Sequence, residues 1–227
     1  GCSTGLLEWV DHIVLPQGSP ESKELEKAGY KLEEDFYVHP GAQLPKIKLG
    51  RGFEVALSVD SIADFLMVRG LSFPIEGSIL SGYRRCIVSD DQEIKIAVIE
   101  RRGVEGDHPI HETGEMLQRV LEAKEKWMTR SRSFEIDDEE AFNQAISLAK
   151  EIAESLGENR AACLVLECER VFWQNRNRAG SLQKGRQDRV GMGWANHDHH
   201  TFRSSRKHFM KLVKLFETLG FHCRERF

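Results

Sequence analysis

The first hundred residues alternate short apolar runs with polar turn residues, a pattern that predicts strands joined by short helices. The predicted strands cover residues 9–15, 32–38, 46–49, 53–59, 72–75, 83–89 and 94–100. One helix begins at Ser19-Pro20-Glu21 and ends at Gly29, and a second covers Ile62–Arg69 and ends at Gly70. The order strand, helix, strands therefore occurs twice, which indicates an internal duplication.

After Gly103 the apolar positions take the spacing of amphipathic helices. We expect helices over residues 114–130, 138–156 and 205–219, with strands at 161–167, 199–202 and 221–227 and a long loop at 175–189. The predicted fold class is α+β. Three segments are expected: a first domain over residues 6–102, a helical connector over 103–133, and a second α+β module with a histidine-rich strand over 134–227.

Composition excludes several classes of protein. The chain has 227 residues, of which 40% are hydrophobic and 30% charged, a balance typical of globular proteins. No apolar run reaches the roughly 18 residues that a membrane span needs. The five cysteines are scattered without CxxC spacing, as in proteins of reducing compartments, so we predict a cytoplasmic protein. Lipid anchoring through Cys2 is the alternative, because Gly1–Gly5 resembles the cleavage region of a bacterial lipoprotein.

Charge is distributed unevenly along the chain. Residues 170–227 hold 13 lysines and arginines against 4 acidic residues, and the remainder holds 19 against 32. The basic segment could attract nucleic acid or an anionic substrate, or it could pair with the acidic half of the chain. Nucleic acid is the least favoured of these partners, because the chain carries no known nucleic-acid-binding signature.

Several short motifs resemble the vicinal oxygen chelate superfamily, which includes glyoxalases, bleomycin-resistance proteins and extradiol dioxygenases. Val10–Leu15 is similar to the Asp-His strand that opens a βαβββ module, and Ala28-Gly29-Tyr30 to the end of its helix. Asp198-His199-His200 followed by Leu219-Gly220-Phe221 resembles a second opening. The resemblance implies βαβββ modules that form a half-open mixed sheet, with extra helices in the middle of the chain, and a homodimer.

The same resemblance implies a divalent transition metal, such as Fe, Mn, Zn or Ni. In the first half the family's ligand positions match Glu54 and Lys95, and a lysine ammonium does not ligate a metal. We therefore expect the domain over residues 6–102 to be a degenerate, metal-free copy, with His12 as a weak candidate ligand. His197 and His199 alternate on one extended segment and therefore share a face, where two imidazoles can bind one metal ion. Carboxylates before the polar loop, at Glu167 and Glu169, are candidates to complete the set.

Basic and aromatic residues near these histidines are candidates for binding the substrate. They are Arg189, Trp194, Arg203 and Arg206, and guanidinium groups suit a carboxylate or phosphate. The leading hypothesis is therefore a metal-dependent enzyme, a dioxygenase, lyase or isomerase, that acts on a small, oxygenated, anionic molecule. The alternatives are a non-catalytic protein of the same fold that sequesters or senses a small molecule, and a nucleic-acid binder.

Overall fold

The fold is described from a computed structural model, which covers residues 5–91, 93–132, 134–196 and 201–223. Its contacts divide the chain into two units. Unit 1 comprises Gly1–Glu76, Arg84–Glu100 and Leu182–Asp198, and unit 2 comprises Gly77–Tyr83, Arg101–Ser181 and His199–Phe227. Each unit is described separately below.

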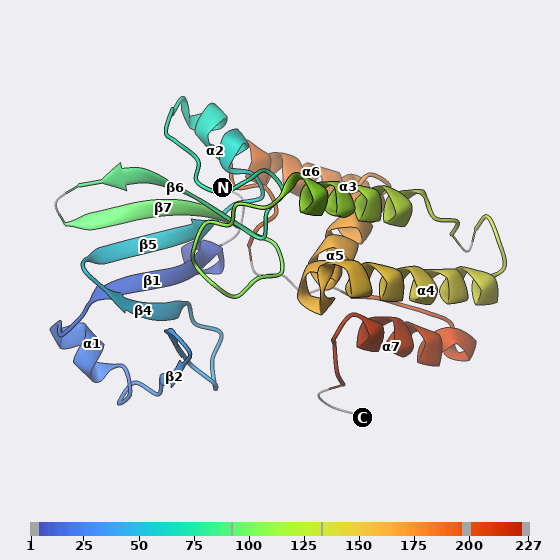
Figure 1. Cartoon of the computed structure of the whole chain (residues 1–227), viewed down its shortest axis with the longest axis horizontal. Coiled ribbons are helices and arrows are strands. Elements are labelled where there is room, and N and C mark those ends of the chain that lie inside the picture. Colours follow the sequence, from blue (N-terminus) through green and yellow to red (C-terminus); the bar gives the residue numbers. More distant parts are fainter. Residues whose placement is uncertain (1–4, 92, 133, 197–200, 224–227) are drawn as a thin grey trace. The chain divides into compact units, whose positions relative to one another are not determined.

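Unit 1 is built on a mixed open sheet of seven strands in the order β2-β3-β4-β1-β5-β7-β6 (Figure 1). The strands are β1 Val10–Pro16, β2 Lys31–Glu33, β3 Phe36–Val38, β4 Lys46–Gly50, β5 Phe53–Ser58, β6 Tyr83–Asp90 and β7 Ile94–Arg101. The short 3-10 turn η1, Leu6–Trp9, precedes β1, and the helices α1, Pro20–Glu24, and α2, Ile62–Arg69, follow β1 and β5. The α+β class predicted from the sequence is confirmed.

The strand pairing repeats within this sheet. β1 pairs in parallel with β4, and β5 pairs in parallel with β7. The two first strands, β1 and β5, pair with each other in antiparallel fashion at the centre of the sheet. The chain order is strand, helix and strands in each half, as the duplicated hydrophobic pattern predicted.

One face of the sheet is covered by α2 and by a segment from the C-terminal part of the chain. Their shared core consists of Trp9, Val59, Ile62, Phe65, Leu66, Cys86, Val98 and Met192. The Ser61 hydroxyl accepts a hydrogen bond from the Asp64 N–H and caps α2, and Gly70 ends it with φ of 63°. Both ends of α2 are therefore where the sequence placed them.

Unit 2 is helical. Its main helices are α3 Gly114–Thr129, α4 Asp138–Leu156, α5 Glu158–Gln174 and α7 Phe209–Thr218, which follows the 3-10 turn η2, Arg206–His208. α4 contacts α3, α5 and α7, and α3 contacts α5. The apolar stripes of these helices, with Leu219, form one core that is centred on Trp127, Ala149 and Cys168, each at most 1% exposed.

Several predicted elements were wrong. Residues 161–167 belong to α5 rather than to a strand, because Ala161, Val165 and Cys168 follow the helical period and bury one stripe. The predicted loop at 175–189 contains α6, Arg178–Asp188. In the first turn of this helix, the Gly180 N–H donates to Asn177 Oδ1 at 2.9 Å. Residues 72–75 form no strand, and only an isolated bridge joins Glu76 to Arg85.

The C-terminal strand predictions fall partly outside the described residues. Thr201 and Phe202 have no strand structure, nor do residues 221–223, while residues 199, 200 and 224–227 lie outside the description. Among the described residues of 134–227, the regular elements are helices and turns, so no second strand-bearing module is visible there.

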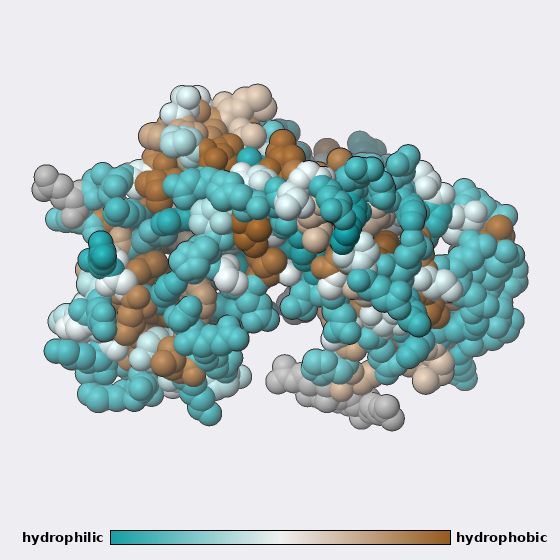
Figure 2. All heavy atoms as spheres, in the orientation of Figure 1, coloured by the Kyte–Doolittle hydropathy of each residue, from teal (hydrophilic) through white to brown (hydrophobic). Residues whose placement is uncertain are grey.

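Hydrophilic residues make up most of the face shown in Figure 2, and a hydrophobic patch lies over the region of α2. Met67 and Val68 of that helix are 72% and 45% exposed. No helix within the described ranges has the length and apolar character required to cross a lipid bilayer.

Candidate functional site

A pocket inside unit 2 is the most developed candidate site among the described residues. It has a volume of about 190 Å³ and is formed by α3, α4, α5, α7 and residues 130–132, 134, 202, 203 and 219. Its apolar walls come from Trp127, Phe134, Ala141, Phe142, Ala145, Val165, Leu166, Trp173, Phe202, Leu212, Leu215, Phe216 and Leu219. Its polar lining consists of Arg130, Ser131, Arg132, Glu169 and Arg203.

The residues that line the pocket differ in their exposure to solvent. Trp127 and Leu219 are 1% and 2% exposed, whereas Phe134 and Trp173 are 63% and 53% exposed. The buried pair therefore forms the floor of the pocket, and the exposed aromatic pair lies at its mouth.

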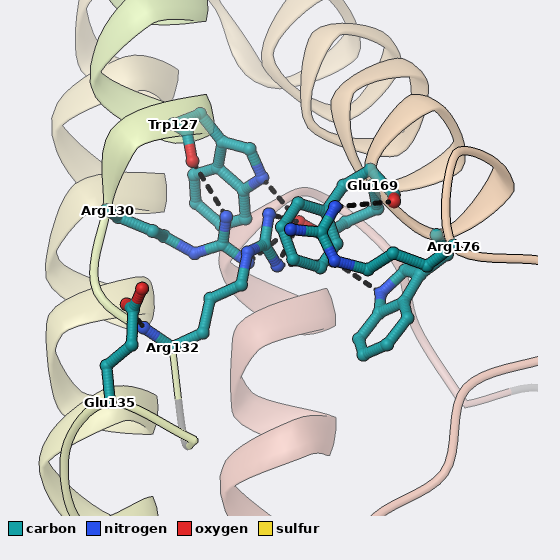
Figure 3. A network of polar contacts seen from close by, with 8 residues as sticks. Trp127, Arg130, Arg132, Glu135, Glu169 and Arg176 are labelled. Carbon is teal, nitrogen blue, oxygen red and sulfur yellow. Dashed lines mark hydrogen bonds and ion pairs between the residues drawn. The ribbon is translucent and has the colours of Figure 1, made fainter.

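Glu169 on α5 is the centre of the polar network in this pocket (Figure 3). Its Oε1 accepts hydrogen bonds from the Trp127 indole at 2.9 Å and from Arg130 at 2.7 Å. Arg132 donates to both carboxylate oxygens at 3.1 Å. The Trp173 indole donates to Oε2 at 3.1 Å. The carboxylate is thus fully engaged by donors of the protein itself.

The two arginines reach Glu169 from the segment that follows α3. The Arg130 guanidinium also donates to the Trp127 carbonyl at 2.7 Å, and the backbone N–H of Arg132 donates to the Glu135 carboxylate at 2.8 Å. These bonds fix the backbone at the end of α3, so both guanidinium groups point back to α5 (Figure 3).

Aromatic rings hold the guanidinium groups from their faces. Arg130 lies 4.2 Å from the centre of the Trp127 ring. Phe172 lies between Arg132 and Arg176, at 3.4 Å and 3.6 Å from its ring centre. Cation–π contacts of this kind orient an arginine and reduce its hydration.

Burial and charge act in opposite directions on this network. Burial alone would raise the pKa of Glu169, but hydrogen bonds from Arg132 and the charges of Arg130 and Arg132 outweigh it, so the pKa is lowered. Burial lowers the pKa of Arg130 despite the attraction of Glu169, and repulsion from Arg132 adds to that effect. The Arg130 and Arg132 side chains are 12% and 7% exposed, so two largely buried cations share one carboxylate.

The four residues predicted to bind substrate are divided between the two units. Arg203 lines the pocket. Arg206 is three residues further on, in η2, and is not part of the lining. Trp194 and Arg189 belong to unit 1, where the Trp194 N–H donates to the Asp60 carboxylate at 2.5 Å and Arg189 is exposed just after α6.

The predicted metal ligands that the structure describes, Glu167 and His12, belong to different units. His197 and His199 lie outside the described residues, so their role stays a prediction. Glu167 is on α5 and pairs with Lys124 at 2.9 Å. His12 is 2% exposed in β1, with Nδ1 2.7 Å from Asp11 and its ring edge-on to Phe36. Within the described ranges, no three histidine, cysteine or acidic side chains come together as a metal site.

The first-half positions that the superfamily pattern singled out do share a face of the sheet. Val14, two residues after His12, lies opposite Glu54, which in turn lies opposite Lys95. Glu54 is 8% exposed and forms an ion pair with Arg85, and Lys95 lies 3.3 Å from Asp90. Glu54 and Asp90 are therefore engaged by cations, and this arrangement does not fit a metal ion.

Sequence reasoning missed most of the pocket. Trp127 and Arg130 fall in the helix predicted over residues 114–130 without a predicted role, and Arg132 has none either. Glu169 is predicted only as a metal ligand. The available signal was the concentration of arginine and tryptophan near the ends of two helices, which is typical of binding sites.

The comparisons with known proteins add no relative. Neither the models of known protein families, nor the curated proteins, nor the solved structures contain a match to this chain.

Proposed function

We propose that this protein binds a small organic anion in the pocket of unit 2 and acts as a sequestering or sensing protein rather than through a metal centre in its sheet. The observation that carries the proposal is the excess of positive charge in a largely apolar cavity. Arg130 and Arg132 are nearly buried and share a single carboxylate. Arg203 adds a third guanidinium, with no ion-pair partner among the described residues.

The physical reason is the cost of burying charge. A cation removed from water is stabilised only by counter-charges and hydrogen-bond acceptors close to it. Glu169 supplies one negative charge for the two nearly buried cations Arg130 and Arg132, whereas Arg203 is exposed and keeps contact with water. An anionic ligand would supply the second negative charge that the buried pair lacks within the lining.

We also propose that unit 1 is a sheet of the vicinal oxygen chelate type. The repeated strand–helix–strands order supports this proposal, as does the parallel pairing of the first and last strands in each half. Relatives of this fold include binding proteins without catalytic activity. The ion pair of Glu54 with Arg85 favours that kind of relative, because it leaves the Glu54 carboxylate committed to a cation.

A matched pair of variants tests the binding proposal. The protein, Arg203→Gln and Arg206→Gln are titrated with a panel of small organic acids, and binding is followed by thermal shift and by fluorescence of Trp127 and Trp173. Acids should stabilise the parent protein and Arg206→Gln to the same extent, and Arg203→Gln less. If no acid raises the melting temperature, or if both variants respond alike, the proposal is wrong.

A further inference from the structure

We infer that the ligand of this pocket is an aromatic carboxylic acid of about one ring, with its carboxylate beside Arg132 and Arg203 and its ring among the aromatic walls. This inference rests on the proposed function and specifies its ligand class. Three features carry it: the donors left open in the pocket, the chemistry of the walls and the volume.

The open donors point to a carboxylate. Arg132 is 7% exposed, and its Nε is buried with no hydrogen-bond partner in the described structure. Its terminal nitrogens bind Glu169 with at most three of the five guanidinium N–H groups, so the side chain keeps donor capacity beyond the Glu169 ion pair. Arg203, which also lines the pocket, is exposed and contributes a guanidinium group that has no ion-pair partner among the described residues. Guanidinium groups bind planar carboxylates with two parallel hydrogen bonds, which suits this arrangement.

The charge of the lining matches one or two negative charges on the ligand. Three arginines and one glutamate give the lining a net charge of +2. Glu169 accepts hydrogen bonds from Arg130, Arg132 and two indoles, so it does not act as an acceptor for hydroxyl groups of a ligand. A neutral polar ligand would therefore find cations and few free acceptors.

The apolar walls of the pocket disfavour a ligand whose body is polar. Thirteen of the eighteen lining residues are apolar or aromatic. A sugar phosphate or a citrate-like acid would bury hydroxyl or carboxylate groups against these walls without hydrogen-bond partners, which is unfavourable for each group. The ligand therefore has its charge at one end and an apolar body at the other.

Six of those thirteen apolar lining residues are aromatic. Phe202 and Phe216 are already arranged edge to face, with ring centres 4.8 Å apart and an angle of 64°. Aromatic groups attract one another beyond the area that they bury when they meet edge to face or offset. A ring inserted between Phe142, Phe202 and the exposed Trp173 gains such contacts, which an aliphatic chain does not make.

The volume sets the size of the ligand. A dry apolar cavity of roughly 150 Å³ accommodates benzene. The pocket, at about 190 Å³, has room within its walls for one ring and a short carboxylate arm. Benzoate and 3-phenylpropanoate are of this size.

Isothermal titration calorimetry of the full chain with four probes tests the inference. The probes are 3-phenylpropanoate, 3-cyclohexylpropanoate, 3-phenylpropan-1-ol and succinate. We expect 3-phenylpropanoate to bind most tightly and the alcohol at least about tenfold more weakly, because it lacks the charge that the guanidinium groups bind. The cyclohexyl acid should bind about threefold to tenfold more weakly, since it loses the aromatic contacts.

Two variants locate the binding. Arg203→Gln should weaken 3-phenylpropanoate by about tenfold and leave the alcohol unchanged. Ala141→Leu narrows the cavity from α4 and should weaken both phenyl compounds, and circular dichroism checks that it folds.

The outcomes separate the two proposals. If succinate binds in a manner that depends on Arg203 and 3-phenylpropanoate does not, the ligand class is wrong and the anion-binding function stands. If the cyclohexyl acid binds as tightly as the phenyl acid, the aromatic requirement is wrong. If none of the four probes binds, both the ligand class and the proposed function are overturned.

Discussion

The exchange of Glu169 for glutamine is the sharpest test of the charge balance in the pocket. The substitution keeps the shape of the side chain and removes its charge, so Arg130 and Arg132 lose their shared counter-ion. The Glu169 side chain is 12% exposed and the two guanidinium groups are 12% and 7% exposed, so solvent screens them little. Removing one partner of a buried ion pair costs about 3 kcal/mol or more in stability.

A second glutamate on the same helix provides the control. Glu167 precedes Glu169 by two residues and pairs with Lys124 at 2.9 Å, but its side chain is 33% exposed and that of the lysine is 42% exposed. A pair of that exposure contributes at most about 1 kcal/mol, so Glu167→Gln should have a small effect. Urea denaturation followed by the helical circular dichroism signal measures both free energies of unfolding.

The effect should also depend on pH in a defined direction. The pKa of Glu169 is lowered in the folded protein, because bonds and charges from the two arginines outweigh burial. Its stabilisation is therefore complete above the ordinary glutamate pKa and is lost as the pH falls towards the lowered folded value. The stability difference between the parent and Glu169→Gln should shrink between pH 7 and pH 3. Equal costs for the two glutamine variants, or a difference that does not change with pH, would refute the reasoning.

Three further predictions concern other parts of the molecule. Gly193→Ala should destabilise unit 1 by about 2 kcal/mol in denaturation experiments, because φ is +62° there and a Cβ would lie 2.4 Å from the Asp60 side chain. Gly185→Ala, on the open face of α6, should instead raise the free energy of unfolding by up to about 1 kcal/mol. Burial raises the pKa of Cys168 to about 11, so mass spectrometry should find its alkylation at pH 8 at least about a hundredfold slower in the native than in the unfolded protein. The metal site predicted at His197 and His199 requires about one equivalent of a transition metal after reconstitution, lost in the double alanine variant, and less than about a tenth of an equivalent in the parent contradicts it.

The sheet was predictable because its signals are local. Strand β5 alternates buried and less buried positions, and α2 is bounded by a serine cap and a glycine stop. Such signals need only a few neighbouring residues, so a single sequence is enough to locate the elements. To predict which strands pair, the duplicated strand–helix–strands order is needed as well, because parallel pairs such as β1 with β4 join segments about thirty residues apart.

The helical unit was harder because its signals are ambiguous. A short apolar run such as Ala161–Glu167 is compatible with a buried strand and with one stripe of a helix, and only its packing partners decide. Helix α6 buries Gln187 and otherwise has mostly polar positions, so it lacks the apolar period by which a helix is usually identified.

The pocket could not be predicted because its chemistry depends on residues that no motif connects. Arg130 and Arg132 meet Glu169 across 39 and 37 positions of the chain, and the ring that Arg132 contacts is three residues beyond that glutamate. Stability alone does not require this arrangement, since a buried ion pair can often be replaced by apolar residues without loss. Two cations held against aromatic rings around one carboxylate instead support the anion-binding function that we propose. The departure from ordinary core packing is therefore the reason to look for function in the helical unit, even though the motifs of the sequence point to the sheet.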